Sequence, residues 1–290
     1  MNVTVFGGSG FLGSHVADAL TEKGMKVTIF DKVKSPYLGE KQNMVVGDVL
    51  DKKAVADAVK DAEVVYNFTA LSDIEEAYGK PYETAEINIM GNLNILEAIK
   101  DKGIKRYVFS SSVYVYSDRG SFYRSSKQAC ELFIEDFQRE YGLNFSILRY
   151  GSLYGPRANQ SNWIYRALKQ ALSEGKITRE GDGEEIREYV HVKDAAKLSV
   201  DILDEKYTNR HLIITGNEPM KIKDLLVMVK EILQGKLSVD YVASKENLHY
   251  EITPYIFNPK IATKLYGNEY LDMGQGILEI LNLIHSEEGK

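Results

Sequence analysis

The stretch NVTVFGGSGFLGSHVADAL, residues 2–20, joins a short run of β-branched residues to a segment with helical spacing. Apolar side chains recur at Leu12, Val16 and Leu20, which places them on one face of a helix. A second β-branched run, KVTIF at residues 26–30, follows this segment. The order of strand, glycine-rich turn, helix and strand predicts an α/β fold built on a doubly wound parallel sheet.

Three glycines, Gly7, Gly10 and Gly13, lie at the turn between the first strand and the helix. Glycines at this spacing let the backbone approach a diphosphate, let the helix pack closely on the strand, and leave the helix N-terminus facing the negative charge. Phe11 and Leu12 begin the helix and are expected to lie against the same ligand. The turn therefore predicts a dinucleotide site, although glycine turns also serve structure alone.

An acidic residue ends the second predicted strand. Asp31 lies 18 positions after Gly13, close to the ~20 expected before a carboxylate that accepts hydrogen bonds from ribose hydroxyls. A carboxylate at this point repels a 2′-phosphate, so NAD is expected rather than NADP. Lys32, a further candidate cofactor contact, and Lys34 weaken this preference because they add positive charge.

Residues at the ends of later predicted strands are further candidates for cofactor contacts. Asp48 and Val49 follow the third strand, and Asp48 is interpreted either as an adenine contact or as the N-cap of the helix DKKAVADAVK. Phe68 and Ala70 end the run AEVVYNFTA, whose small final residues let a cofactor lie close. Tyr150, in the run LRYGSLYG, completes this set.

Composition and charge exclude several classes of protein. The chain of 290 residues is 44% hydrophobic and has no Gly/Ser linker, so it can bury a large core. Its 36 basic and 42 acidic side chains give a net charge of -6 without a Lys/Arg block, which argues against a nucleic-acid partner. No apolar run is long enough for a membrane span, and the chain opens on NVTVFGG without room for a signal segment. A single cysteine and the lack of a Cys/His cluster predict a cytoplasmic protein without a metal site.

The stretch FSSSVYVYSDRGSFYRSSK, residues 109–127, combines a serine-ended strand with the start of a helix. Tyr123 is expected just before or within the first helical turn, and Lys127 lies one turn further on the same face. A tyrosine with a pKa of about 10 needs ~4 kcal/mol of preferential phenolate stabilisation to act as a base near pH 7. A neighbouring ammonium and an oxidised nicotinamide supply positive charge for this purpose. Taken alone, however, a Tyr and a Lys four residues apart are usually a solvated pair.

Landmarks along most of the chain resemble the extended short-chain dehydrogenases/reductases, and most closely the NAD-dependent epimerase/dehydratase family of nucleotide-sugar enzymes. In order they are GGSGFLG, Asp31, GDV, NIMGNLNILEA, FSSSVYVYS, YRSSK, LRYGSLYGPR and GDGEEIREYVHVKD. The resemblance implies a Rossmann-type fold and a general acid/base role for Tyr123. It also implies that Lys127 lowers the tyrosine pKa and holds the nicotinamide ribose, and that Ser112 binds the substrate oxygen. Tyr114 and Tyr116 are interpreted as packing residues.

One departure from the family pattern bears on the reaction. The 4,6-dehydratases of this family carry an Asp-Glu pair where this chain has Val113 and Tyr114, so elimination of water is disfavoured. The resemblance then implies an NAD-dependent epimerase of a nucleotide sugar, acting at the fourth carbon through a keto intermediate. A keto-sugar reductase or dehydrogenase using NAD or NADP is the alternative enzyme. A non-catalytic dinucleotide-sensing or scaffold protein of the same fold is the third possibility.

The resemblance implies few contacts with the substrate. Ser152 replaces the family's asparagine in LRYGSLYG, and Arg187 is a candidate clamp on the substrate diphosphate because a guanidinium bridges two phosphate oxygens. The loop between Ser117 and Tyr123 holds only DRGSF, so an unusually open sugar pocket is expected. Trp163 is interpreted as a stacking partner of a nucleotide base or, more simply, as a core residue.

Two lobes are expected. Residues 1–155, with a return segment at about 185–205, form the dinucleotide-binding domain, and residues 156–184 and 206–290 form a smaller C-terminal substrate-binding lobe. In the second lobe, NPKIATKLYG is predicted to form a short helix capped by Asn258 and ended by Gly267. The resemblance also implies a homodimer that pairs the helix carrying Tyr123 and the segment 88–98.

Overall fold

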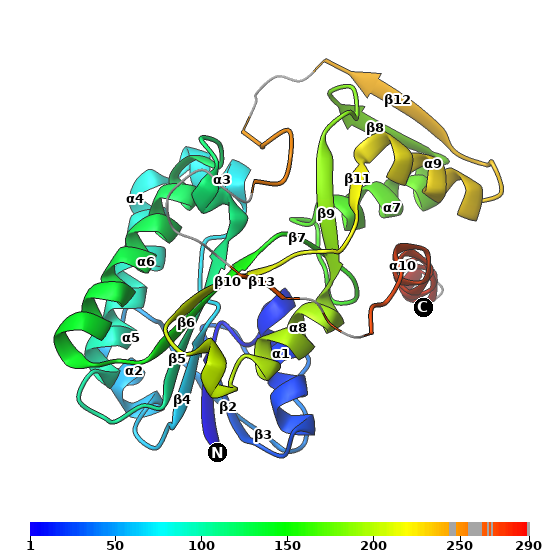
Figure 1. Ribbon diagram of the computed structural model, residues 1–290. Coiled ribbons are helices and arrows are strands. Elements are labelled where there is room, and N and C mark those ends of the chain that lie inside the picture. The colour runs from blue at the N-terminus through cyan, green and yellow to red at the C-terminus, as the bar shows by residue number, and fades with distance from the viewer. Residues whose placement is uncertain (244–247, 255–262, 266, 268, 289–290) are drawn as a thin grey trace.

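A single parallel sheet dominates the computed structural model, which describes residues 1–243, 248–254, 263–265, 267 and 269–288 (Figure 1). Its eight strands lie in the order β13-β10-β6-β5-β4-β1-β2-β3, and every neighbouring pair is parallel. The strands are β1 (Asn2–Phe6), β2 (Lys26–Asp31), β3 (Gln42–Val46), β4 (Val64–Asn67), β5 (Arg106–Ser112), β6 (Phe145–Tyr150), β10 (Arg210–Ile214) and β13 (Thr263–Lys264). The predicted doubly wound α/β fold is confirmed.

Helices cover both faces of this sheet. On one face lie α1 (Phe11–Glu22) and α8 (Val192–Asp201), which contact each other; on the other lie α2 (Lys52–Ala58), α5 (Gly91–Ile99) and α6 (Ser121–Tyr141) (Figure 1). Strand side chains alternate between the two resulting cores, so that Val5 packs with α1 and the adjacent Phe6 packs with α5. Because both faces are buried, the central strands are almost continuously apolar, which is typical of parallel sheets.

The strand order reverses between β1 and β4. From β1 the chain moves outward through β2 to β3, and from β4 it moves the other way through β5 to β6. Ligands of open α/β sheets bind at such a point, beyond the carboxyl ends of the strands. The glycine turn after β1 and the serines that end β5 both lie at this edge. Short helical segments follow β4 and β5: α3 (Ile74–Gly79), α4 (Pro81–Thr84), a π-helical turn (Ala85–Met90) and a 3-10 turn (Val113–Tyr116).

A smaller lobe with its own core packs beyond this edge (Figure 1). Its elements are β7 (Ser152–Tyr154), α7 (Trp163–Glu174), β8 (Lys176–Glu180), β9 (Ile186–His191), β11 (Pro219–Lys221), α9 (Ile222–Ile232), β12 (Ser238–Val242) and α10 (Met273–Glu288). The strands form a three-stranded sheet, β11-β9-β7, and a β12-β8 pair. A further 3-10 turn (Glu205–Tyr207) precedes β10.

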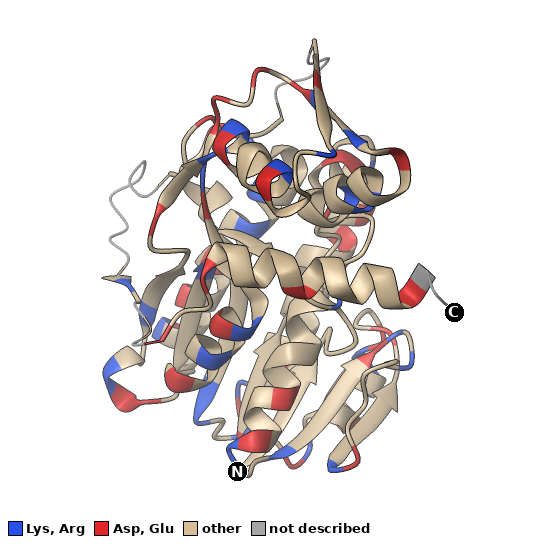
Figure 2. Ribbon diagram, turned by 90° about the vertical axis from the view of Figure 1, so that its right-hand side faces the viewer, with Lys and Arg blue, Asp and Glu red and all other residues tan. Residues whose placement is uncertain are grey.

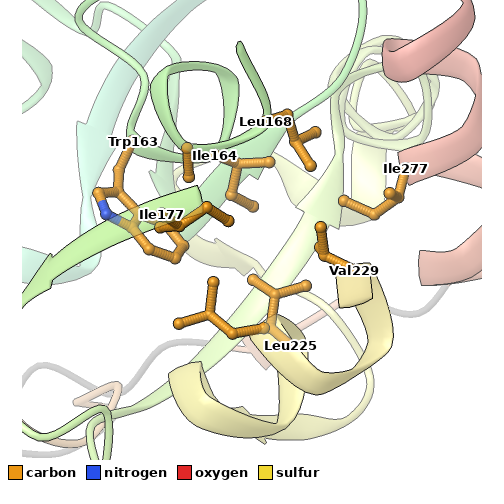
Figure 3. Close-up of a pocket in the computed structure, with 9 residues that line it drawn as sticks. Trp163, Ile164, Leu168, Ile177, Leu225, Val229 and Ile277 are labelled. Atoms are coloured by element: carbon orange, nitrogen blue, oxygen red, sulfur yellow. The ribbon is translucent and has the colours of Figure 1, made fainter. Parts of the chain in front are cut away.

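Trp163 is partly buried and packs against the core of this lobe. Its ring lines a small apolar cavity of about 10 Å³ with Ile164, Ile177 and Leu225 (Figure 3). The guanidinium of Arg179 lies 5.2 Å from the ring centroid. A cavity of this size holds no more than a water molecule. The simpler interpretation of Trp163 as a core residue therefore fits the structure better than stacking on a nucleotide base.

Two expectations for the C-terminal third need correction. Strand β10 was expected in the smaller lobe, but it pairs with β6 in the main sheet because its apolar Leu212 and Ile214 complete the core under α8. The predicted helix at NPKIATKLYG falls mostly outside the described residues, since 255–262 and 266 are not described. Its described residues Thr263 and Lys264 form strand β13, which pairs with β10.

Candidate active site

The glycine turn after β1 is closed tightly against the end of β4. Gly7 has φ +71°, and a Cβ there would lie 2.7 Å from the backbone carbon of Phe68. A Cβ on Gly13 would lie 2.3 Å from the carbonyl oxygen of Gly7. Gly10 is the N-cap of α1, has no side chain to satisfy the first amides, and is followed by no acidic residue in the first turn. The helix N-terminus is thus left with its positive dipole end and unpaired amides, which suits a diphosphate.

Asp31 holds the same turn. Its Oδ2 accepts a hydrogen bond from the amide of Ser9 at 3.0 Å, and its Oδ1 accepts one from the amide of Val33 at 3.2 Å. A carboxylate has about four acceptor sites, so each oxygen retains capacity for a ribose hydroxyl. Lys32 is exposed beside it. The uncapped helix, the cradle that a Cβ would fill and the carboxylate together fit a dinucleotide whose ribose has free hydroxyls.

The other candidate cofactor contacts divide into two groups. Val49, Phe68 and Ala70 lie on the loops that follow β3 and β4, at the carboxyl edge of the sheet with the glycine turn. Tyr150 ends β6, and its phenol is buried in the core under α8, where it hydrogen-bonds Ser199 Oγ at 2.6 Å. Its ring still approaches Phe68, with centroids 6.5 Å apart.

Asp48 is not the N-cap of α2. Asp51 fills that position, accepting from the amides of Lys53 at 2.9 Å and Ala54 at 3.1 Å. Asp48 instead accepts from the amide of Leu50 at 2.9 Å in the preceding turn. The capping interpretation of Asp48 was wrong by one helical turn, and the adenine contact stays a prediction.

Ser112, Tyr123 and Lys127 meet between the end of β5 and the first turns of α6. Tyr123 is the third residue of α6, which starts after Gly120 at φ +96°. Helical spacing places Lys127 on the same face one turn later. The Ser112 side chain lies close enough to Tyr123 to lower the pKa of its phenol, and Lys127 Nζ donates to the carbonyl oxygen of Ser110 at 2.6 Å. The three predicted residues are thus brought together.

Burial dominates the electrostatics of this group. It raises the pKa of Tyr123 to about 12, and the nearby Ser112 hydroxyl lowers it only in part. Burial also lowers the pKa of Lys127 to about 8. Lys127 Nζ lies 5.7 Å from the Tyr123 ring centroid and is bonded to a carbonyl. The expected net lowering of the tyrosine pKa by Lys127 is therefore not present in the protein alone, so phenolate formation near pH 7 requires added positive charge.

A segment far along the chain, Leu248–Tyr250, packs against the short loop between Ser117 and Tyr123. The amide of Gly120 donates to the carbonyl oxygen of Leu248 at 2.9 Å. The Tyr114 phenol hydrogen-bonds His249 Nδ1 at 2.6 Å. We call Leu248–Tyr250 the strap. These contacts place the strap against the short loop, and the openness of the sugar pocket stays a prediction.

Tyr250 connects the strap to both candidate substrate residues. Its ring centroid lies 4.6 Å from that of Tyr114, and its hydroxyl lies 3.4 Å from Ser152 Oγ. The Arg187 guanidinium stands 4.2 Å from the Tyr250 ring centroid and donates to the carbonyl oxygens of Ile186 and Glu251. Sequence reasoning missed His249 and Tyr250, because no local motif marks them and only the fold brings them to the loop.

The described residues contain no cluster of three or more His, Cys, Asp or Glu side chains that could hold a metal ion. Within the same described ranges, no helix has the length and hydropathy needed to cross a bilayer. Figure 2 shows basic and acidic residues interspersed over both lobes.

A glycine cradle on a parallel sheet, next to a Ser-Tyr-Lys group on β5 and α6, defines a dinucleotide-dependent enzyme of the short-chain dehydrogenase/reductase type. The sequence pattern of the NAD dependent epimerase/dehydratase family matches residues 3–215. The chain belongs to this family.

Relatives within the family carry out different reactions. The UDP-N-acetyl-alpha-D-glucosaminuronate decarboxylase of Bacillus cytotoxicus is 31% identical, over 83% of this chain and 81% of its own length. The solved UDP-N-acetylglucosamine 4-epimerase of Methanobrevibacter ruminantium superposes with a TM-score of 0.87 at 26% identity, covering 99% of this chain and 98% of that one. The UDP-glucose 4-epimerase of Thermotoga maritima has a TM-score of 0.86 with 99% and 100% covered; at 23% identity it shows the fold alone.

Proposed function

We propose that this protein is an NAD-dependent 4-epimerase of a nucleotide-activated sugar, with a UDP-sugar as substrate. The observation that carries the proposal is the approach of Ser112 to Tyr123, one helical turn from Lys127 and next to a cradle that fits NAD. The 4-epimerase structure at 26% identity supports this reaction.

Each residue of the group has a separate task in the proposed reaction. Ser112 holds the sugar hydroxyl oxygen, and Tyr123 takes its proton as the carbonyl forms and returns a proton to the same oxygen afterwards. Lys127 orients the nicotinamide ribose and adds positive charge next to the phenol. Bound NAD supplies hydride uptake and return and a further positive charge. Since the proton and the hydride both return to the sugar, the product is an isomer and no net oxidation occurs.

The residues at the position of the dehydratase carboxylates favour this outcome over loss of water. Val113 is fully buried and carries no ionisable group. Burial raises the pKa of Tyr114 well above its usual value, and its phenol is already bonded to His249. Neither side chain supplies the extra acid and base that elimination requires.

We also propose that Arg187 and Ser152 contact the substrate diphosphate and that the chain forms a homodimer. Leu132 and Phe133 of α6 and Met90, which directly precedes α5, are large apolar side chains left exposed, and these segments are the expected dimer helices. Static light scattering of wild-type protein and Phe133→Glu tests the dimer. Val227→Glu, on the exposed face of α9, is the control.

The proposed reaction is tested with purified protein and a panel of UDP-sugars that includes a uronic acid. Mass spectrometry of the denatured protein identifies the retained dinucleotide, and NMR identifies the sugar product. We expect retained NAD and a 4-epimer. A pentose formed from the uronic acid would instead indicate a decarboxylase, as in the relative from Bacillus cytotoxicus.

Tyr123→Phe tests the assignment of the base. The ring still packs while the phenol is lost, so turnover should fall by at least ~100-fold, the usual lower range for a general acid/base, and NAD should be retained. Tyr141→Phe, at the exposed far end of the same helix, is the matched control. Turnover in Tyr123→Phe equal to that in Tyr141→Phe would remove Tyr123 from the mechanism.

A further inference from the structure

Three successive serines of β5 contact three successive turns of α6. The carbonyl oxygen of Ser110 accepts from Lys127, and the side chain of Ser112 lies close enough to Tyr123 to lower the pKa of its phenol. Between them, Ser111 Oγ donates to Glu131 Oε1 at 2.5 Å. The first two contacts involve the reacting group itself, whereas the third has no part in the proposed chemistry.

Glu131 is placed on the same face of α6 as Tyr123 and Lys127, because the three residues are spaced four apart. It is 2% exposed and Ser111 is also 2% exposed, so their hydrogen bond is shielded from water. A carboxylate is almost never buried without a partner that compensates its charge. The charge of Glu131 therefore requires a partner within the protein.

Arg149 of β6 provides the compensating charge. Its Nε donates to Glu131 Oε1 at 3.0 Å and its Nη2 to Oε2 at 2.5 Å, a bidentate pair with both side chains buried. Nη1 of Arg149 also bonds the Tyr116 hydroxyl at the end of the 3-10 turn. The other ionisable groups facing Glu131 are His211 of β10, 3.9 Å away, and Lys127 and Cys130 of α6.

We propose that Glu131 is a positioning residue for the reaction: held by Arg149, it clasps β5 through Ser111 and so fixes the distance between Ser112 on the strand and Tyr123 and Lys127 on the helix. This inference rests on the proposed function for its kinetic consequence, although the clasp itself concerns only the chain. Two elements that carry parts of one reacting group must keep their spacing, because a misplacement of about 1 Å can lower a rate by roughly 100-fold.

Ser111→Ala is the sharpest test. It removes the hydroxyl that joins β5 to Glu131 and leaves the Arg149 pair in place, whereas any change at Glu131 itself would strand a buried guanidinium. We expect kcat to fall about tenfold, equivalent to ~1.4 kcal/mol on the barrier, and KM to stay within about twofold. A loss confined to kcat indicates misaligned reacting groups rather than weaker substrate binding.

Ser146→Ala is the matched control. Ser146, like Ser111, is a buried strand serine bonded to a buried charged side chain, here accepting from Arg106 at 2.7 Å, but it lies near the start of β6, away from the carboxyl edge. Ser111→Ala loses one side-chain hydrogen bond and Ser146→Ala loses two, to Arg106 and to the carbonyl oxygen of Tyr207, so Ser146→Ala should lose at least as much thermal stability. Only Ser111→Ala should lose kcat; equal losses in the two variants would overturn the proposal.

A second readout does not depend on turnover. In wild-type protein without cofactor, burial lowers the pKa of Lys127 to about 8. Loosening the clasp admits water at the start of α6, so the pKa should rise toward 10.5 in Ser111→Ala and not in Ser146→Ala. Lysine-selective NMR titration measures it, with the signal assigned by its loss in Lys127→Met.

The two readouts separate the inference from the function on which it rests. If wild-type protein converts no sugar, the proposed function fails while the Lys127 titration still decides whether the clasp exists. If wild-type protein is an epimerase and Ser111→Ala has an unchanged kcat and an unchanged Lys127 pKa, the clasp is wrong and the function stands.

Discussion

The cofactor side and the substrate side of the site are built in different ways. On the cofactor side, Gly7, Gly13 and Asp31 lie within a single strand-turn-helix-strand unit, in which Gly13 packs against Gly7 and Asp31 bonds the turn. On the substrate side, Tyr114 meets His249 and Tyr250, which lie 135 or more residues further along the chain. The first arrangement follows from local backbone geometry, whereas the second exists only once both lobes have folded.

The largest expected effect is on the cofactor side, where the backbone leaves the least room for an added side chain. In Gly13→Ala the new methyl would lie 2.3 Å from the Gly7 carbonyl oxygen, so the turn must open. We expect NAD retention to be lost and stability to fall by ~1–3 kcal/mol, the usual range for overpacking. Mass spectrometry of released dinucleotide and thermal unfolding measure the two effects.

Gly79→Ala is the control for that change. A Cβ at Gly79 meets nothing within 4 Å, and the residue lies in α3, where alanine is the better helix former. This variant should retain NAD and unfold at the wild-type temperature or slightly above. NAD retention by Gly13→Ala at the wild-type level would show that the local geometry of the turn does not determine cofactor binding.

A smaller effect is expected on the substrate side. His249→Ala removes the partner of the Tyr114 phenol and loosens the strap, so KM for the sugar nucleotide should rise about tenfold, equivalent to ~1.4 kcal/mol, while NAD is retained. Steady-state kinetics measure this. His285→Ala, at an exposed position in α10, should behave as wild type. A KM unchanged by His249→Ala would show that the strap does not contribute to substrate binding.

The smallest expected effect is on the pH dependence of stability, at the junction of β9 and α8. His191 ends β9, is buried, and lies 3.2 Å from Glu279 of α10. Burial lowers the pKa of His191 to about 4, against 6.5 for an ordinary histidine, and Glu279 offsets this only in part. Between these values the unfolded chain binds more protons, so the free energy of unfolding should decrease as the pH falls from 6.5 towards 4.

Thermal unfolding at pH 7 and pH 5 measures this dependence. His191→Asn keeps a side chain that can cap α8 and removes the titrating group, so its unfolding temperature should fall less between the two pH values. His285→Asn should show the same decrease in unfolding temperature as wild type. Equal decreases in wild type and His191→Asn would assign the acid sensitivity to other groups.

The sequence predicted the fold class, the glycine turn and the approach of Ser112 to Tyr123 and Lys127, because periodicity and turn geometry act over short distances. It did not predict the strap or the buried Glu131 and Arg149 pair, since these contacts join elements that only the sheet order brings together. The error at Asp48 has a local cause: two aspartates three residues apart both suit a helix start, and the helix uses Asp51.

Strands β10 and β13 come from the last third of the chain but pair in the main sheet, which limits how the protein can be divided. A fragment ending near residue 205 would leave β6 with unpaired backbone groups along one edge, where edge-to-edge aggregation starts. Engineering that exchanges substrate lobes between relatives should therefore leave β10 and β13 with the main sheet and move α10 together with α7 and α9, with which it shares a core. Cuts at a single boundary should yield insoluble halves.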